Sequence, residues 1–398
     1  MQPLAADTGE QIVEFSRNKT QTRVLFLIRS LEIGGAERQL LTLVRGLDKE
    51  RFDVTVVSMY AGGTLEAQFR AIPGCTLRSA SKSGRWDVAG FGSRLAAIIR
   101  EARPHIIHGY MGGANEIAWV AGRLARARVI WGIRVSDIDF GSYTWSVGAL
   151  FRTGQVLARH VDLIICNSEA GRNVHLRAGY PEARTIVIPN GIDADNFRPA
   201  AVEGALFRSA RSLPADAALI VLPARLDPMK DHPTFLRAAA RIAGDWPDLQ
   251  FLCIGDGPPD YRASLIELAR NLGLEGRVQW QPADASPRAL YNAAQLVTTC
   301  SRFGEGFPNV LGEAMACGTP CITTPSGDAA RVVGPTGWIV PFSDPEALAA
   351  AWREALSESP DARSSRGRSA RDRILREFSI PLLIDRSERV FATLAGMP

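Results

Sequence analysis

The sequence predicts an α/β protein made of two doubly wound domains that face each other across a cleft. The chain has 398 residues, which exceeds the usual size of one domain. In both halves short apolar runs alternate with helical patterns, as in parallel sheets covered by helices. The alternation breaks over residues 190–214, where glycine, proline and polar residues gather. Because doubly wound sheets bind ligands beyond the carboxyl ends of their strands, we expect the site in the cleft.

Each half contains six apolar runs that we expect to be buried parallel strands. In the first half they span residues 23–29, 52–58, 105–108, 128–131, 162–166 and 185–188. In the second half they span residues 219–222, 250–254, 278–280, 296–298, 320–323 and 338–340. Helical patterns such as 37–47 and 92–101 separate these runs.

The expected domain organisation follows from these elements. It comprises a polar N-terminal extension over residues 1–20, a first domain over 21–195, a second domain over 196–376 and a final segment over 377–398. Apolar residues recur at helical spacing in the final segment, between Pro381 and Leu394, so we expect a helix there.

Composition and charge limit the classes of protein to which the chain can belong. No apolar run reaches the roughly 18 residues that a membrane-spanning helix needs, and the first twenty residues lack the apolar core of a signal peptide. We therefore expect a cytoplasmic protein. The six cysteines form no Cys-x-x-Cys pair, and the five histidines show no metal-site spacing. Buried free thiols are the expected outcome.

The net charge of +4 is distributed unevenly. Residues 1–195 carry 24 basic and 19 acidic side chains, and between Arg70 and Arg134 there are 11 basic and only 3 acidic ones. Two interpretations stay open. The arginines form a solvated surface without a partner, or they form a patch that faces anionic lipid or a phosphate-linked acceptor. We expect no nucleic-acid partner.

The segment from Glu305 to Glu313 carries the strongest chemical signal. Its two glutamates lie eight positions apart, on either side of the first turn of an expected helix that ends at Gly318. Pro308 suits the first helical position, because a proline there loses no intrahelical hydrogen bond. The backbone N–H groups around this turn would then point into the cleft with the positive end of the helix dipole. The segment concerned consists of Phe307, Pro308, Asn309 and Val310, and all of these except the proline carry a backbone N–H. A phosphate seat flanked by two carboxylates suits a nucleotide sugar.

Two cations follow the first strand of the second half. Arg225 and Lys230 lie in the expected loop between that strand and the next helix. Arginine can bind two phosphate oxygens at once and lysine acts as a point charge, so with the start of the helix they would form a metal-free clamp on a diphosphate. Two Asp-x-Asp pairs, at 137/139 and 193/195, are weaker candidates for a metal, because this pattern is common by chance.

Together these features resemble the retaining GT-B glycosyltransferases of family 4. Four motifs match in the expected order, namely Gly34-Gly35-Ala36-Glu37-Arg38, Asn190-Gly191-Ile192-Asp193, Arg225 with Lys230, and Glu305 to Glu313. The resemblance covers the chain from about Arg23 to its C-terminus. It implies two Rossmann-like domains, the first on the acceptor side and the second binding the nucleotide sugar, with residues 377–398 crossing back to the first domain.

The resemblance also implies an activity. A sugar would pass from a nucleotide-diphosphate sugar to a glycan, lipid-linked or other hydroxyl acceptor with retention of configuration, without a metal or other cofactor. Cell-surface polysaccharide or lipopolysaccharide synthesis, with peripheral contact to the inner membrane surface, would be the setting. An epimerase or hydrolase on the same fold, or a non-catalytic sugar-nucleotide sensor, is the alternative.

Site roles follow from the same resemblance. Glu305 would accept hydrogen bonds from the donor sugar, while Glu313 would bind the ribose hydroxyls. Gly34 and Gly35 would let the backbone approach the donor. The base would be contacted by the loop that holds Gln281 and Ala283, and residues 255–257 would line the same cleft. The identity of the base and of the sugar is not readable from these residues.

One position departs from the family pattern. Some relatives carry a histidine after the strand at 128–133, and this chain has Arg134 near that place. A guanidinium cannot act as a general base. Arg134 would therefore bind an anionic group of the acceptor or sugar, or His108 would take the acceptor-side role, although the position of His108 favours a core histidine. The stretch 143–151 would offer an amphipathic contact to the acceptor or form a core helix.

Overall fold

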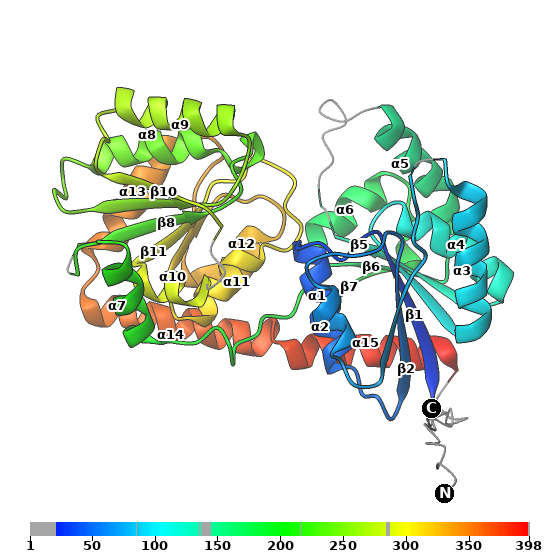
Figure 1. Ribbon diagram of the computed structural model, residues 1–398. Helices are drawn as coiled ribbons and strands as arrows, with labels where there is room; N and C mark the ends of the chain where they lie inside the picture. The colour runs from blue at the N-terminus through cyan, green and yellow to red at the C-terminus, as the bar shows by residue number, and fades with distance from the viewer. Residues whose placement is uncertain are drawn as a thin grey trace, which may run out of the picture.

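The computed structural model describes residues 21–84, 86–134, 136, 145–215, 217–283 and 287–396, and at 145–150 it describes the backbone alone. The expected extension over 1–20, the 137/139 aspartates and residues 143–144 lie outside the described residues, and the rest of the stretch 143–151 begins the helix α5 (Trp145–Leu157). Figure 1 shows two lobes side by side, each with a central sheet, and a long helical segment that runs beneath both.

The described residues of the first half form a seven-stranded parallel sheet in the order β3-β2-β1-β4-β5-β6-β7. The strands are β1 (Thr22–Ile28), β2 (Phe52–Ser58), β3 (Cys75–Ser79), β4 (Ile106–Tyr110), β5 (Arg128–Ile133), β6 (Leu163–Cys166) and β7 (Thr185–Val187). The apolar runs predicted six of them. The prediction missed β3, an edge strand whose side chains alternate between half-buried and exposed and so form no apolar run.

Helices cover both faces of this sheet. They are α1 (Gly35–Gly46), α2 (Glu66–Arg70), α3 (Val88–Ala102), α4 (Ala114–Ala125), α5 (Trp145–Leu157) and α6 (Glu169–Arg177). One core layer joins the sheet to α1 and the chain around α2, and the other joins it to α3 and α4. The sheet is therefore doubly wound, as predicted.

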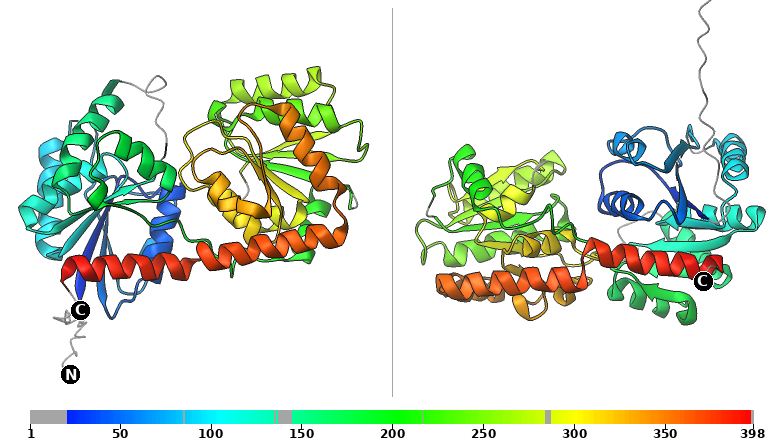
Figure 2. Two further views of the ribbon diagram at one scale, coloured as in Figure 1. Left: turned by 180° about the vertical axis from the view of Figure 1, so that it is seen from behind. Right: turned by 90° about the horizontal axis from the view of Figure 1, so that it is seen from below.

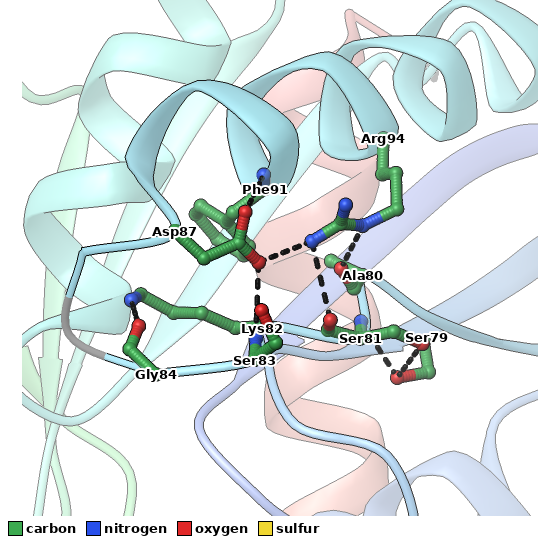
Figure 3. A network of polar contacts seen from close by, with 9 residues as sticks. All are labelled: Ser79, Ala80, Ser81, Lys82, Ser83, Gly84, Asp87, Phe91 and Arg94. Atoms are coloured by element: carbon green, nitrogen blue, oxygen red, sulfur yellow. Dashed lines mark hydrogen bonds and ion pairs between the residues drawn. The ribbon is translucent and has the colours of Figure 1, made fainter.

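A polar network fixes the loop between β3 and α3 (Figure 3). Asp87 caps α3 by accepting a hydrogen bond from the Phe91 N–H at 3.1 Å, and it accepts another from the Ser83 N–H at 3.0 Å. Arg94, one turn into α3, pairs with Asp87 and donates to the Ala80 carbonyl at 2.8 Å. The Ser83 N–H and the Arg94 guanidinium hold the pKa of Asp87 below its usual value, so the loop stays tied to α3 at neutral pH.

The described residues of the second half form a six-stranded parallel sheet in the order β10-β9-β8-β11-β12-β13. Its strands are β8 (Leu219–Pro223), β9 (Gln250–Ile254), β10 (Val278–Gln281), β11 (Leu296–Thr299), β12 (Cys321–Thr323) and β13 (Trp338–Ile339). All six were predicted from apolar runs.

Helices again cover both faces of the second sheet. They are α7 (Ala201–Ala210), α8 (His232–Ile242), α9 (Pro259–Asn271), α10 (Pro287–Ala293), α11 (Asn309–Ala316), α12 (Ala329–Val333), α13 (Pro345–Ser357) and α14 (Pro360–Glu377). The layer of α8, α9 and α13 centres on the buried rings of Phe235 and Trp352. The opposite layer contains α11, α12 and α14, and α11 begins within the segment 305–313 that was predicted to seat a phosphate.

The last helix, α15 (Ile380–Ala395), follows α14 and packs under the first sheet (Figure 2). The ring of Phe391 lies 6.0 Å from Phe26 and 6.1 Å from Phe52, in edge-on contact. At the junction, the Ile192 N–H donates to the Phe378 carbonyl at 2.8 Å. Residues at the end of the chain thus complete the core of the first domain and fix its place beside the second.

Candidate active site

A cavity of about 590 Å³ opens between the two domains. On the first domain it is bounded by the loops after β1, β4, β5 and β6, and on the second by the loops after β8 and β11 and the start of α11. Its lining includes Gly34, Gly35, Glu37, Met111, Arg134, Asn167, Asn190, Arg225, Lys230, Ser301, Glu305 and residues 306–310. The expected position beyond the carboxyl ends of both sheets is confirmed.

The first turn of α11 presents free donors to this cavity. The helix begins at Asn309, so Pro308 is its N-cap residue and not, as predicted, its first helical residue. Its carbonyl accepts the Leu311 N–H at 3.1 Å. The N–H groups of Asn309 and Val310 make no hydrogen bond within the described part of the chain. Two donors and the positive end of a helix dipole therefore meet at the cavity wall.

The other end of α11 is closed as the sequence predicted. Gly318 follows the helix with φ +78°, in the left-handed region. Its N–H donates to the Met315 carbonyl at 2.9 Å, and the Thr319 N–H donates to the Ala314 carbonyl at 3.0 Å. These are the two bonds of a Schellman motif, and they fix the length of the helix.

Lys230 and Glu305 form an ion pair in the cavity wall. The Lys230 ammonium donates to Oε1 of Glu305, which also accepts the Ser301 hydroxyl at 2.6 Å. The two side chains are only 18% and 17% exposed, so water screens the pair weakly. Ser136 of the first domain donates its hydroxyl to the Glu305 carbonyl. The carboxylate is thus held by Lys230 and Ser301, while Ser136 holds the backbone of Glu305.

Arg225 stands apart from this pair. Its side chain is 72% exposed, with Asp227 as its nearest described carboxylate at 3.8 Å. The loop that carries it is fastened to the next strand, because the Ala224 N–H donates to the Ile254 carbonyl at 2.9 Å. Gly255 makes this possible, since a side chain there would collide with the Ala224 carbonyl oxygen. Residue 255 therefore shapes the Arg225 loop.

Gly34 and Gly35 bring α1 close to the second domain. Gly34 is the N-cap of α1 in extended backbone, so its φ of −152° does not require glycine. A Cβ at Gly34 would meet the Glu37 carboxylate, so Glu37 would have to move away from the start of α1. A Cβ at Gly35 would lie 3.3 Å from the side-chain nitrogen of Asn309. The glycine pair thus permits close approach to the second domain without a positive φ, while the expected approach to the donor stays a prediction.

Three predicted donor residues lie outside the cavity lining. Glu313 is half-buried on α11 and accepts the Tyr291 hydroxyl at 2.8 Å. Gln281 accepts the Arg211 guanidinium at 2.6 Å, and the Ala283 N–H lies 3.3 Å from an Asp256 carboxylate oxygen. The structure does not bring these three together with Glu305 and Lys230.

The two acceptor-side candidates have different surroundings. Arg134 lines the cavity, stacks 4.4 Å from the centre of the Tyr110 ring and donates to Asn190 at 3.2 Å. His108 is 1% exposed, with its ring 5.3 Å from Phe26. Burial and the Arg134 charge hold the pKa of His108 well below its usual value, so the ring is neutral. His108 is a core residue and does not reach the cavity.

Two cavity residues gave no strong signal in the sequence. Glu37, on the first turn of α1, has its pKa raised by burial, and its own backbone N–H opposes that shift. Asn190 donates its side-chain amide to Asn309 at 2.9 Å and so joins the end of the first domain to the start of α11. Both lie in motifs that were noted for their glycines, and only the fold shows that these side chains face the cavity.

Comparison with known proteins agrees with this architecture. The model described as Glycosyltransferase Family 4 matches residues 33–196, and the model described as Glycosyl transferases group 1 matches residues 217–358. The putative glycosyltransferase EpsF of Bacillus subtilis (strain 168) is 26% identical over 387 residues, which are 95% of this chain and 96% of EpsF. A D-inositol 3-phosphate glycosyltransferase of Thermobispora bispora is 30% identical over 293 residues, 67% of this chain and 66% of that protein.

Solved structures show the same fold. Anabaena Alr3699/HepE, in complex with UDP and glucose, superposes with a TM-score of 0.81 at 22% identity, covering 94% of this chain and 100% of that chain. WaaG, a glycosyltransferase involved in lipopolysaccharide biosynthesis, gives a TM-score of 0.70 at 16% identity, covering 94% and 100%. Two parallel-sheet domains around a common cleft define the GT-B class of glycosyltransferase. The chain belongs to the group 1, family 4 glycosyltransferases.

The Glu313 carboxyl makes the stability of the protein depend on pH. Burial raises the pKa of Glu313 to about 7 from 4.5, against opposing effects of the Tyr291 hydroxyl and Arg38. Between these values the folded protein holds a proton that the unfolded chain releases, so rising pH favours unfolding. We expect the wild type to lose up to about 3 kcal/mol of unfolding free energy relative to Glu313→Gln between pH 4.5 and 8.

Urea unfolding at pH 5 and pH 8 measures this difference, with the exposed Glu346→Gln as the control variant. Parallel pH profiles for the wild type and Glu313→Gln would show that Glu313 titrates like an ordinary carboxyl.

Proposed function

We propose that this glycosyltransferase moves a sugar from a nucleotide-diphosphate sugar to a hydroxyl acceptor, with retention of configuration and without a metal ion. The observation that carries the proposal is the meeting, in one interdomain cavity, of the Lys230–Glu305 pair with the free N–H groups of Asn309 and Val310. The lysine charge and the two N–H groups match the diphosphate of a nucleotide sugar, and the carboxylate matches the hydroxyls of its sugar.

The diphosphate would lie against the second domain. Lys230, Arg225 and the first turn of α11 all border the cavity there. Breaking the sugar–phosphate bond builds negative charge on the leaving phosphate, and preorganised cations and N–H groups stabilise that charge. HepE has been solved with UDP and with UDP-glucose, which supports a nucleotide sugar as donor.

Glu305 would orient the donor sugar. One of its oxygens is engaged by Lys230 and Ser301, which leaves the other to accept sugar hydroxyls. Retention would follow if the acceptor hydroxyl attacks from the face that the phosphate leaves, with a phosphate oxygen taking the hydroxyl proton. Lys230 would then contact both the Glu305 carboxylate and the phosphate. Binding and release of the diphosphate would therefore both change the Lys230–Glu305 ion pair.

The acceptor would enter on the first-domain side, past Arg134. Its guanidinium is held by Tyr110 and Asn190, which suits it to fix an anionic group on the acceptor or on the transferred sugar. A glycan or lipid-linked acceptor in cytoplasmic steps of cell-surface polysaccharide or lipopolysaccharide synthesis fits this charge. The likeness to WaaG, which is involved in lipopolysaccharide biosynthesis, supports that setting at the level of the fold.

Contact with an anionic membrane surface is part of the proposal. Within the described ranges, no helix combines the length and apolar character that a bilayer crossing needs. Four arginines from the basic stretch line a second cavity, of about 1220 Å³, at the amino ends of the first sheet's strands, away from the active site. They are Arg100, Arg103, Arg126 and Arg128. These side chains therefore cannot serve an acceptor in the cleft, and phosphate headgroups are their better partner.

Two exposed apolar side chains lie on the same outer layer of the first domain, and one of them, Leu124, lines the cavity with these arginines, whereas Trp86 lies at the other end of α3. Trp86 is 88% exposed at the start of α3, and Leu124 is 78% exposed at the end of α4. The Asp87 network holds the loop that presents Trp86 (Figure 3). Tryptophan favours the interface between headgroups and lipid tails. Basic and apolar residues on the layer of α3 and α4 suit a peripheral membrane contact.

Loss of either cation should weaken diphosphate binding. A charge-assisted hydrogen bond contributes roughly 1.5–3 kcal/mol, so Arg225→Ala and Lys230→Ala should each weaken binding of the preferred nucleoside diphosphate by about tenfold or more. Thermal shifts with UDP, GDP, ADP and dTDP measure this, with and without EDTA, because a ligand stabilises the folded state by RT ln(1 + [L]/Kd), so that weaker binding gives a smaller shift. Arg241→Ala, on α8 outside the cavity lining, is the control. Equal shifts in all variants, or shifts abolished by EDTA, would contradict the clamp.

Removal of the Glu305 charge should slow transfer without abolishing nucleotide binding. We expect Glu305→Gln to lower kcat by roughly 100-fold, since it loses electrostatic contacts at the reacting sugar. NMR of the products, with glycosides and polyprenyl-diphosphate sugars as acceptors, should show the donor's anomeric configuration retained. An inverted linkage would contradict retention. A free monosaccharide would indicate a hydrolase, and an isomerised donor would indicate an epimerase.

Vesicle binding should depend on the arginine-lined cavity. The double variant Arg100→Glu/Arg126→Glu should bind phosphatidylglycerol vesicles at least about tenfold more weakly than the wild type, because each arginine near an anionic surface contributes roughly 1 kcal/mol. Arg353→Glu, in the second domain, should bind as the wild type does. Co-sedimentation at low and high salt gives the affinities. Equal binding to phosphatidylcholine vesicles would contradict an electrostatic contact.

A further inference from the structure

One carboxylate of the second domain reaches across the cleft to the first. Asp328 follows β12, and its side chain is 3% exposed. One of its oxygens accepts the Glu169 N–H and the other accepts the Ala170 N–H, both at 2.9 Å. Arg331 lies 3.2 Å from the same carboxylate. A buried carboxylate of one domain therefore takes two backbone donors of the other.

These donors belong to the first turn of α6. Ser168, the N-cap of this nine-residue helix, satisfies only the Gly171 N–H with its side chain, at 3.0 Å. The remaining donors of the turn, at Glu169 and Ala170, take their acceptors from Asp328. A negative charge at this end of a helix also interacts favourably with the helix dipole. The helix is thus fully capped only when the second domain is in place.

The same loop holds the backbone of Glu305. The Asp328 N–H donates to the Gly306 carbonyl at 3.0 Å. Gly327 has φ +59°, and a side chain there would collide with the Glu305 carbonyl oxygen. That oxygen also accepts the Ser136 hydroxyl from the first domain. Residues 305–306 are therefore packed between the Asp328 loop and the first domain.

We propose that Asp328 is a positioning residue that couples closure of the two domains to the placement of Glu305. Its carboxylate meets α6 only when the domains are apposed, and its backbone fixes the segment that carries Glu305. Closure then brings Arg134 and Glu37 of the first domain opposite the Lys230–Glu305 pair. The link to catalysis rests on the proposed function, whereas the link to closure does not.

The proposal predicts that loss of Asp328 lowers the rate of sugar transfer without lowering the affinity for the nucleoside diphosphate. The groups assigned to the diphosphate, Arg225, Lys230 and the first turn of α11, all belong to the second domain and do not touch Asp328. Loss of Asp328 should leave nucleoside diphosphate affinity within about twofold. It should lower kcat/KM for transfer by at least tenfold, because the first domain no longer holds its place.

The first variant is Asp328→Asn, which keeps the shape of the side chain. An asparagine oxygen can accept one N–H of α6, but its amide group then faces the other donor. Asp344→Asn is the matched control, since Asp344 caps α13 by accepting the Glu346 and Ala347 N–H groups at 3.0 and 2.9 Å within the second domain. We expect a larger radius of gyration by small-angle X-ray scattering for Asp328→Asn only.

A variant on the facing helix tests the same contact without touching the second domain. Proline is well tolerated at the first helical position, and Ser168 already has extended backbone, as a residue before proline requires. Glu169→Pro would put a ring carbon where the N–H meets Asp328, and Glu169→Ala keeps that N–H. Glu169→Pro should change the radius of gyration and kcat/KM as Asp328→Asn does. The double variant Asp328→Asn/Glu169→Pro should show no larger change than either single variant.

Two results would overturn the proposal. One is transfer by Asp328→Asn and Glu169→Pro at the wild-type rate with an unchanged radius of gyration. The other is loss of diphosphate affinity and thermal stability to the same degree in Asp328→Asn and Asp344→Asn, which would make Asp328 an ordinary helix cap. If the wild type transfers no sugar, the proposed function fails, and the scattering comparison still decides whether Asp328 holds the domains together.

Discussion

The packing of α15 against the first sheet is the constraint on which the cleft depends. Phe391 closes a core between the rings of Phe26 and Phe52, so the last helix is as much part of the first domain as its own strands. Close approach is possible because Gly46 on α1 leaves room for the side chain of Ile384. Burial of one phenylalanine contributes roughly 1.5–3 kcal/mol, and the helix buries several apolar residues. Since α14 belongs to the second domain and leads directly into α15, this packing places the two carboxyl edges opposite each other before any ligand binds.

Within the cleft, the Lys230–Glu305 pair keeps two charges largely shielded from water and yet leaves Lys230 able to change its partner. Removing charges from water is costly, so a lone lysine or glutamate at 17–18% exposure would be destabilising. Pairing offsets that cost, while the Ser301 hydroxyl adds a third partner. The pair is also open to exchange, because a phosphate can replace the carboxylate beside Lys230. Arg225 is different. It is exposed and only loosely placed near Asp227, so it can move to a ligand at little cost in broken contacts.

Much of the fold and part of the site could be predicted from the sequence, for identifiable physical reasons. Buried parallel strands are continuous apolar runs, which is why β3 alone, exposed on alternate residues at the sheet edge, was missed. Arg225, Lys230 and the start of α11 were predictable because each lies in a local strand–loop–helix pattern. The roles of Ser136 and Asp328 were not, since both depend on contacts across the cleft. His108 was a candidate because it lay at the end of an expected strand. The strand β4 continues two residues further, and the His108 side chain faces the core.

The helices α1, α6 and α11 begin beside the cleft, and different groups face the N–H donors of their first turns. At α1, Glu37 folds its carboxylate back toward the start of its own helix. At α6, Asp328 of the other domain supplies a carboxylate to two N–H groups. At α11, the N–H groups of Asn309 and Val310 have no acceptor in the described part of the chain. An anion gains from a helix start only where no protein carboxylate already occupies it. In the proposed function, the carboxylates of Glu37 and Asp328 would therefore do more than stabilise α1 and α6, because by occupying the positive ends of those helices they would direct a donor phosphate to α11, beside Lys230 and Glu305.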